Sequence, residues 1–383
     1  MYNNDHSKSI NVLSRRDFLK TAAIAAGAVA LNPLVGRAQE RIYVKKRSAA
    51  SALATKLPSN RYRYTDAHCH YVDFLQRTDG IQTLLNQMDA AGVYHIQIMG
   101  LPLLKKWNAA DPREPRYYLE DDSRTYWYSV TDPIVARAVK ELAEKDRRRF
   151  HPFICGFNPT NRNAVDHVCR MIQWFPDFWE GIGEIFTRHD DLTGLTYGET
   201  ARANNIALDP VYRLAAENDL PVQMHNNIGN KWLKEPVYMH EMEGALRGHP
   251  KTRFIWAHVG ISRDFNIPSI IRDADRLLKT YDNLWFDLSW VVFEDNVAPG
   301  GKLDRDWVSL VEDYPERFMI GTDKVGHFDT YVKEIKKYDI LLDALKPEIS
   351  RLVASENFLR VLPGRVQARA FENEMGKTMG LHS

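Results

Sequence analysis

Six side chains that bind metals or move protons recur at similar places along the chain. Two histidines, His68 and His70, are separated by a single residue. On an extended strand, residues i and i+2 point to the same face. Two imidazoles on one face can hold one divalent metal ion. The other four candidates each lie near the end of a short apolar run: Glu184, His225, His258 and Asp323. A lone His-x-His pair is a weak motif, but its recurrence with further ligand types is more specific.

Short apolar runs that alternate with amphipathic stretches indicate the elements that must position these residues. Strands are expected at 62–70, 93–99, 150–156, 179–185, 220–225, 252–258, 283–289 and 317–323. Helical spacing of apolar residues predicts helices at 81–92, 132–148, 163–175, 210–218, 236–247, 268–281 and 305–313.

This alternation predicts the α/β class and a (β/α)8 TIM barrel in a single domain. A doubly wound open sheet is the alternative, but the sequence lacks the glycine-rich phosphate loop expected early in that fold. In a closed barrel the carboxyl ends of the strands converge on one mouth. The six candidate residues would therefore become neighbours.

The first residues have the pattern of an export signal. Ser14–Lys20 resembles the twin-arginine signature, an apolar run spans Thr21–Leu34, and small residues at Gly36 and Ala38 fit cleavage after Ala38. We expect a signal peptide at 1–38, an N-terminal arm at 39–60 and the barrel with its C-terminal helices at 61–383. The twin-arginine export machinery is then a partner and the location is periplasmic. An uncleaved membrane anchor is the alternative, although the apolar run is short for a span.

Charge and cysteine content exclude some classes of function. Without residues 1–38 the chain keeps 46 basic and 48 acidic side chains, which gives no electrostatic reason to expect nucleic acid as a partner. Three cysteines, Cys69, Cys155 and Cys169, are an odd number and argue against a disulfide framework. We expect Cys69, between the two histidines, to point away from them into the core.

Four short motifs resemble one enzyme superfamily. They are Asp66-Ala67-His68-Cys69-His70, Ala257-His258-Val259-Gly260, Gly321-Thr322-Asp323 and Ser355-Glu356-Asn357-Phe358. Over residues 62–362 the sequence is similar to the amidohydrolase superfamily of metal-dependent TIM-barrel enzymes, in the amidohydrolase-related (amidohydrolase 2) branch, which also contains decarboxylases.

The resemblance implies roles for the six candidates. One divalent metal would be bound by His68, His70, His225 and Asp323. His258 would either bind a second metal or transfer protons. Glu184 matches the place of a bridging carboxylate or carboxylated lysine, with an ion pair to Arg188 as the alternative.

The leading hypothesis is metal-assisted hydrolysis of a small, cyclic or aromatic substrate. A divalent ion lowers the pKa of a water molecule toward about 7. Zinc suits the nitrogen and oxygen ligands, manganese or iron are alternatives, and one or two ions can be accommodated. Asp323 would accept the proton from the water that attacks an amide, ester or lactone carbonyl, and His258 would stabilise the oxyanion.

Two other functions stay open at this stage. In non-oxidative decarboxylation the metal would hold the substrate carboxylate or an adjacent oxygen, and a protonated His258 or Asp323 would deliver a proton to carbon. An arginine that reaches the mouth would help, with Arg188 and Arg263 as candidates. A non-catalytic binding protein is the minor alternative, and it predicts lost ligands, whereas all expected ligands are present.

Several other residues are candidates for contact with a small-molecule substrate. Trp127, Trp232 and Trp290 would line the mouth or be buried in the core, and Lys324 would bind an anionic group or be structural. The aromatic segment 100–131 is expected to form part of a lid. We expect a solvated loop at 189–191 and structural roles for His95, His151, His240 and His249. A homo-oligomer is compatible with the resemblance.

Overall fold

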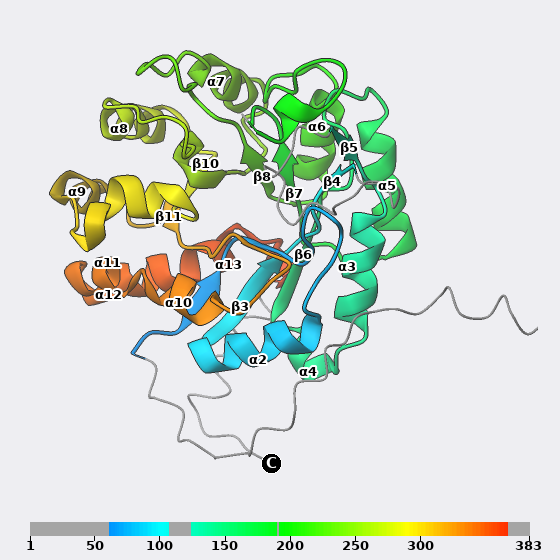
Figure 1. Cartoon of the computed structure of the whole chain (residues 1–383), viewed down its shortest axis with the longest axis horizontal. Helices are drawn as coiled ribbons and strands as arrows, with labels where there is room; N and C mark the ends of the chain where they lie inside the picture. Colours follow the sequence, from blue (N-terminus) through cyan, green and yellow to red (C-terminus); the bar gives the residue numbers. More distant parts are fainter. Residues whose placement is uncertain (1–60, 107–123, 190, 367–383) are drawn as a thin grey trace, which may run out of the picture. The chain divides into compact units, whose positions relative to one another are not determined.

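Eight parallel strands form the central sheet of the computed structural model, which describes residues 61–106, 124–189 and 191–366 (Figure 1). Neighbouring strands in the sheet follow the order of the sequence. They are β1 (Tyr64–Asp66), β3 (Val93–Ile98), β6 (Phe150–Ile154), β7 (Gly181–Phe186), β8 (Val222–His225), β9 (Phe254–Trp256), β10 (Leu284–Asp287) and β11 (Phe318–Met319).

A second pair of short strands joins the two ends of the sheet. β2 (Cys69–His70) continues the first strand and pairs in parallel with β12 (Lys324–Val325), which continues the last. Two further backbone hydrogen bonds join the first strand to the last. The amide of Ala67 donates to the carbonyl of Ile320 at 2.9 Å, and the amide of Asp323 donates to the carbonyl of His68 at 2.8 Å. The barrel is therefore closed, and the expected (β/α)8 fold is confirmed.

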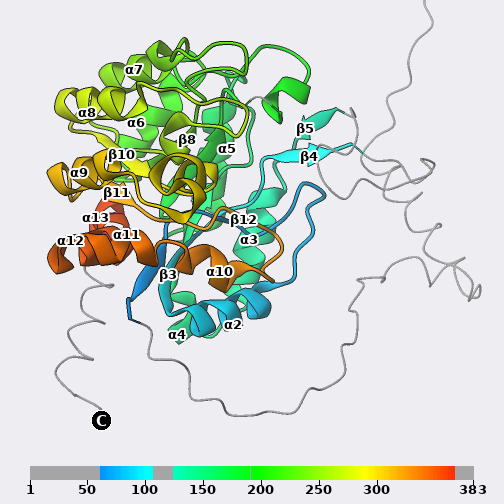
Figure 2. The same ribbon diagram turned by 60° about the vertical axis from the view of Figure 1, so that its left-hand side comes forward.

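Helices cover the outer face of this sheet and one end of the barrel (Figures 1 and 2). They are α2 (Ile81–Ala91), α3 (Thr131–Lys140), α4 (Glu144–Arg147), α5 (Ala164–Trp174), α6 (Asp209–Glu217), α7 (Met239–Gly248), α8 (Ile270–Thr280), α9 (Arg305–Asp313), α10 (Tyr331–Lys336), α11 (Asp339–Ala344), α12 (Pro347–Arg351) and α13 (Asn357–Val361). Short 3-10 turns are η1 (Thr193–Leu195), η2 (Ala257–Gly260) and η4 (Pro299–Gly301), and π-helical turns are η3 (Phe293–Val297) and η5 (Leu352–Glu356).

Local sequence explains several of these boundaries. The left-handed conformation of Gly92, at φ 80°, ends α2, and the side chain of Asp304 caps α9 by accepting from the amides of Asp306 and Trp307. The helix expected at 132–148 is divided in two, because Arg147 donates to the carbonyls of Lys140 and Leu142 where α3 ends. The first strand is divided because the carboxylate of Asp66 accepts from the amide of His68.

A plug of apolar side chains fills the barrel below the strand ends. It includes Phe153, Ile255 and Met319 from the strands, Ala67 and Met99 from the positions directly after β1 and β3, and Phe358 from α13. Phe358 stacks on Phe153 with ring centroids 6.2 Å apart, and Asn357 donates to two backbone carbonyls near β11. The Ser-Glu-Asn-Phe motif near the C-terminus therefore closes the end of the barrel opposite the mouth.

Some expectations fall outside the described residues or at their edge. Residues 1–60, with the expected signal and arm, are not among them. Of the expected lid, the structure describes an antiparallel hairpin of β4 (Leu103–Lys105) and β5 (Thr125–Trp127), whereas residues 107–123 lie outside it. Within the described ranges, no helix combines the length and apolar character needed to cross a membrane. Cys69 is buried in the core, as expected.

Candidate metal centre

Four ligand atoms from strands one, four and eight lie close together at the mouth. The Nε2 atoms of His68 and His70 are 3.3 Å apart. Glu184 Oε2 lies 3.4 Å from the first and 3.2 Å from the second. Asp323 Oδ1 lies 3.3 Å and 3.5 Å from the same two nitrogens. We call these four residues the first donor group.

The remaining oxygens of the two carboxylates face a second set of imidazoles. Glu184 Oε1 lies 3.0 Å from Nδ1 of His225 and 3.7 Å from Nε2 of His258. Asp323 Oδ2 lies 3.7 Å from the same nitrogen of His258. Glu184, His225, His258 and Asp323 form the second donor group, so each carboxylate contributes one oxygen to each group.

The spacing and chemistry of both groups fit metal ions. Two ligand atoms that each lie about 2.1 Å from one zinc ion at a tetrahedral angle are about 3.4 Å apart. The separations of 3.2–3.5 Å in the first group match this value. In the second group the separations range from 3.0 to 3.7 Å, and Glu184 contributes one oxygen to each group.

The outer nitrogen of each imidazole is held by a hydrogen-bond acceptor. Nδ1 of His70 donates to the carbonyl of Gly100 at 2.7 Å, and Nδ1 of His258 donates to the carbonyl of Ser289 at 3.1 Å. Nε2 of His225 donates to the side-chain oxygen of Asn227 at 3.0 Å. In each neutral ring, the nitrogen that faces the carboxylates is then unprotonated. Lone pairs that face carboxylates are stable only with a cation between them, which is the pattern of metal-binding histidines.

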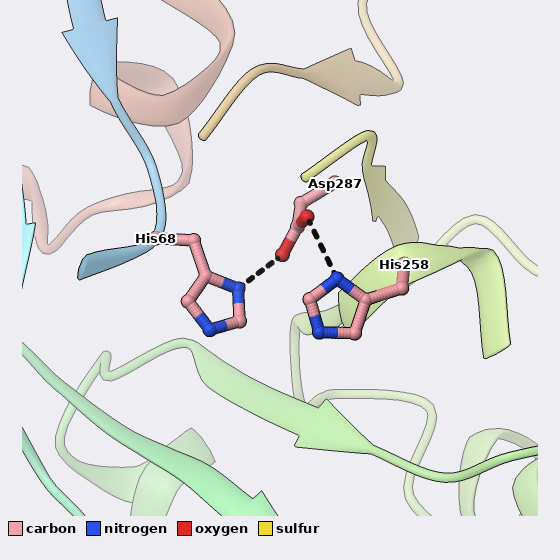
Figure 3. A group of neighbouring side chains, drawn as sticks. All are labelled: His68, His258 and Asp287. Atoms are coloured by element: carbon pink, nitrogen blue, oxygen red, sulfur yellow. Dashed lines mark hydrogen bonds and ion pairs between the residues drawn. The ribbon is translucent and has the colours of Figure 1, made fainter. Parts of the chain in front are cut away.

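Asp287, at the end of β10, holds the outer edges of two of these rings (Figure 3). Its Oδ2 accepts from Nδ1 of His68 at 2.8 Å, and its Oδ1 lies 3.9 Å from Nδ1 of His258. Ser289 also lies behind the ligands, with its hydroxyl 2.9 Å from Nδ1 of His258. His68, His258 and Asp287 could themselves hold an ion. However, the nitrogens involved point away from Glu184 and Asp323, so we assign Asp287 to the support of the ligands.

The electrostatics of the buried centre agree with this arrangement. Burial alone would raise the pKa of Glu184, but the imidazoles of His68 and His225 hold it well below its usual range. Burial likewise opposes ionisation of Asp287, yet the charge of His68 and its hydrogen bond lower the pKa to about 2. Burial would lower the pKa of His68, and the charges of Asp323, Glu184 and Asp287 raise it well above its usual value. The centre is therefore built to hold positive charge.

Unusual backbone conformations position three residues at the mouth. His258, Trp290 and Asp323 have φ values of 56°, 57° and 48°, in the left-handed region that side chains other than glycine rarely adopt. Such conformations cluster at functional sites, where the surrounding structure maintains them. Gly321 allows the last strand to approach the first, because a Cβ there would lie 2.7 Å from Cβ of His68.

A cavity of about 340 Å³ opens above the donor groups. One part of its wall is apolar and aromatic, from Phe74, Leu101, Phe186, Leu192 and Trp290. The polar part comprises His70, Asp73, Glu184, His189, His225, His258, Asp323, Lys324 and His327. Its size suits a small molecule with one ring.

A profile of the amidohydrolase family (Amidohydro_2) matches residues 65–363 of this chain. The chain belongs to the amidohydrolase family. With the donor groups described above, this membership makes it a metal-dependent enzyme of the amidohydrolase superfamily.

Three solved structures are among those similar to this chain. A probable 2-pyrone-4,6-dicarboxylic acid hydrolase from Acinetobacter baumannii has 12% identity and a TM-score of 0.50, covering 78% of this chain and 98% of that chain. Dihydroorotase from Campylobacter jejuni has 16% identity and a TM-score of 0.46, covering 78% and 82%. A 2,6-dihydroxybenzoate decarboxylase has 14% identity and a TM-score of 0.46, covering 78% and 99%. Among curated proteins, none matches the chain. At 12% identity, the first likeness supports the fold alone.

The structure brings all six predicted ligand candidates of this amidohydrolase together. They are His68, His70, Glu184, His225, His258 and Asp323. The grouping differs from the expected one, because His225 lies with Glu184 and His258 rather than with the strand-one pair. Glu184 faces imidazoles and does not pair with Arg188.

Of the five substrate candidates, two line the cavity and three do not. Trp290 and Lys324 do, with Nζ of Lys324 donating to the hydroxyl of Thr330 at 2.8 Å. Arg188 instead forms an ion pair with Glu241 and lies over the ring of Tyr238. Trp127 packs partly buried against the core. Trp232 is 80% exposed and is not among the residues that line the described cavity.

Sequence reasoning missed two residues of the amidohydrolase site. Asp287 ends an apolar strand, which was the same signal that identified Glu184 and Asp323, but no motif marked it. His189 was expected in a solvated loop, yet it is buried and its ring stacks on His225 with centroids 4.5 Å apart. Burial lowers the pKa of His189 well below its usual value, and the neighbouring His225 lowers it further.

Proposed function

We propose that this chain is a hydrolase that uses two divalent metal ions, with zinc favoured by the ligand types and manganese or iron as alternatives. The observation that carries the proposal is that the two carboxylate oxygens of Glu184 face different donor groups. Its Oε2 lies with His68 and His70, and its Oε1 lies with His225 and His258. A carboxylate that faces two donor groups in this way is suited to bridge two ions, and paired ions are typical of hydrolytic sites.

The proposed chemistry is the attack of water on an amide, ester or lactone carbonyl. Bound metal would lower the pKa of water and polarise the carbonyl oxygen. Asp323 is suited to accept the proton and return it to the leaving group, because its side chain lines the cavity and is 13% exposed. Glu184 is only 1% exposed, which favours a purely binding role.

His258 is suited to bind the second ion through Nε2. Its ring is oriented from behind by Ser289, and its Nε2 faces the carboxylates of both donor groups. Because the proton of His258 is on Nδ1, Nε2 has none to donate to a substrate oxygen, and stabilisation of the oxyanion would come from the metal. The apolar wall with Trp290 and Phe186 favours a small substrate that carries a flat ring.

Decarboxylation is the weaker candidate because its expected arginines are engaged elsewhere. Arg188 is paired with Glu241, and Arg263 is paired with Asp191. The described cavity lining has Lys324 as a cation, but no arginine. A substrate carboxylate held by the metal would therefore lack the additional arginine contact expected for decarboxylation.

We also propose that the enzyme is exported in the folded state by the twin-arginine machinery to the periplasm. The support is the Ser-Arg-Arg-Asp-Phe-Leu-Lys run at 14–20 and the apolar stretch after it. A variant with both Arg15→Lys and Arg16→Lys should stay in the cytoplasm. Normal export of that variant would count against this route.

The deciding test is the metal content of the purified enzyme and of Glu184→Gln. We expect two ions per chain in the wild type and one in the variant. Glu180→Gln is the matched control, since Glu180 is also a buried carboxylate next to a histidine, at the other end of the same strand. It should keep two ions. One ion in both the wild type and Glu184→Gln would refute the bridge, and no ion after addition of zinc or manganese would refute a metalloenzyme.

A further inference from the structure

Two buried glutamines meet in the interior of the barrel, next to the candidate metal centre. Gln97 lies on β3 and Gln223 on β8, and neither side chain is exposed. Nε2 of Gln97 donates a hydrogen bond to Oε1 of Gln223. Because β6 and β7 separate these two strands in the sheet, the contact crosses the interior and does not join neighbouring strands. Branched apolar side chains usually fill this space in such barrels, so a pair of amides there calls for a reason.

The acceptors around Gln223 determine the direction of this chain of hydrogen bonds. Nε2 of Gln223 lies 3.0 Å from Oδ2 of Asp287 and 3.3 Å from the carbonyl oxygen of Ala67. A backbone carbonyl and a carboxylate oxygen accept, so the amino end of Gln223 must face them and its oxygen must face Gln97. The chain of donors therefore runs from β3 through β8 to Asp287 at the end of β10.

Asp287 accepts hydrogen bonds on both of its oxygens. Oδ2 accepts from Nδ1 of His68 at 2.8 Å as well as from Gln223, and these two donor nitrogens lie 3.1 Å apart. Oδ1 accepts from the amide of Ser289 at 2.7 Å. Without the donor from Gln223, the carboxylate would be freer to turn about its Cβ–Cγ bond. Gln223 therefore fixes the oxygen atom that orients His68.

The second oxygen of the pair argues against a purely structural role for Gln97. Its Oε1 is buried and has no hydrogen-bond partner among the residues that the structure describes, and its Nε2 also lies 3.6 Å from Sδ of Met99. An unpaired buried acceptor lowers the stability of a fold. A methionine of similar length would avoid that cost, so stability alone does not account for an amide at this position.

We propose that Gln97 and Gln223 are positioning residues for metal binding. Their amides hold Oδ2 of Asp287 against Nδ1 of His68, and this directs Nε2 of His68 toward the first donor group. The inference rests on the metal centre of the proposed function, but not on the reaction performed there. An acceptor behind an imidazole ligand needs support of its own, because the ligand is only as well oriented as that acceptor.

The zinc affinity of methionine variants tests this role, because methionine keeps the length of glutamine without its amide. Competition with a coloured chelator should show zinc binding about tenfold weaker in Gln223→Met and about threefold weaker in Gln97→Met. Gln82→Met is the matched control and should bind zinc as the wild type does, since the exposed Gln82 donates to Asn86 on α2. A lower thermal midpoint with unchanged zinc affinity would overturn the proposal. If Gln223→Met does not fold, Gln97→Met decides.

A double variant tests whether Gln223 acts through Asp287. Asp287→Ala removes the acceptor that Gln223 supports. Zinc binding by the variant with both Gln223→Met and Asp287→Ala should therefore lie within about twofold of Asp287→Ala alone. Losses of affinity that multiply would show that the two residues act independently, and they would overturn the proposal.

Cobalt in place of zinc gives a readout that a change in stability alone does not move. The visible absorption of bound cobalt depends on the geometry of its ligands, so the band of Gln223→Met should shift, whereas that of Gln82→Met should match the wild type. An unchanged band in Gln223→Met would overturn the proposal. A wild type that binds neither zinc nor cobalt would refute the metal centre and the positioning role together. Failure to hydrolyse a panel of esters, lactones and amides, with these readouts as expected, would refute only the proposed reaction.

Discussion

Nδ1 of His68 lies 2.8 Å from Oδ2 of Asp287, although the two residues come from the first and seventh strands of the barrel. The same carboxylate accepts from Nε2 of Gln223 at 3.0 Å, so three strands meet behind one candidate ligand. An ionised acceptor behind an imidazole fixes its orientation and raises its basicity as a ligand.

We therefore expect Asp287→Asn to weaken metal binding. The variant loses the negative charge behind His68, and loss of such support costs about 10- to 100-fold in metal affinity. Competition with a coloured chelator measures the effect on zinc. Asp282→Asn, at the exposed start of the same strand, is the control and should bind zinc as the wild type does. An unchanged affinity in Asp287→Asn would show that Asp287 does not support the ligands.

Trp290 and Trp232 should respond differently to truncation. Trp290 lines the cavity, and its ring centroid lies 5.1 Å from that of His258, whereas Trp232 is 80% exposed. For a substrate found by screening, Trp290→Ala should raise KM about tenfold or more through loss of apolar contact. Trp232→Ala should leave KM unchanged. A larger effect at Trp232 would place the substrate outside the cavity described above.

Arg188→Met should destabilise the fold rather than abolish the chemistry. Its guanidinium and the carboxylate of Glu241 form an ion pair in which Glu241 is 2% exposed, and removal of one partner from a buried pair costs about 3–5 kcal/mol. Urea denaturation measures the loss. Arg137→Met is the comparison, since the pair of Arg137 with Glu141 is exposed and is worth about 0.3–0.5 kcal/mol. A stable but inactive Arg188→Met would return Arg188 to the list of substrate ligands.

His327 should make the stability of the cavity rim depend on pH. Partial burial lowers its pKa, but hydrogen bonds and charges of Asp79 and Asp73 outweigh this and raise the pKa above 6.5. Because the folded pKa is the higher one, the stabilisation is fully present below the unfolded value of about 6.5 and is lost as pH rises through the folded pKa.

His327→Gln should therefore lower the thermal midpoint most at pH 5.5–6 and least above pH 8, where the histidine is neutral in the wild type as well. His240→Gln is the control, because His240 is exposed and its Nδ1 lies 3.1 Å from the backbone carbonyl of Val237 and not beside a carboxylate in that contact. A midpoint difference that is constant from pH 5.5 to 9 would exclude the charged pairing.

The barrel and its six ligand candidates were accessible from the sequence because both leave local patterns. Parallel strands are continuous apolar runs, and a polar residue at the end of such a run is conspicuous. Division of the first strand was not accessible, since it depends on the contacts that Asp66 makes with His68 and, at 2.8 Å, with the amide of Thr322 on the last strand.

Residues whose roles depend on distant partners were the ones misjudged. Arg188 looked available because Glu241 lies on α7, in a later repeat of the barrel. His189 looked like a loop residue because its stacking on His225 and the amides that donate to its ring appear only in the fold. The burial of a side chain in a long loop is set by packing and not by local composition.

Closure of the barrel by β2 and β12 has a consequence for biogenesis. The first donor group takes His68 and His70 from the beginning of the domain and Asp323 from its end. A chain still on the ribosome cannot assemble this group until its last strand has emerged. Metal uptake by this group would then follow emergence of the last strand. The binding free energy of the ion would oppose opening of the seam between the first and last strands.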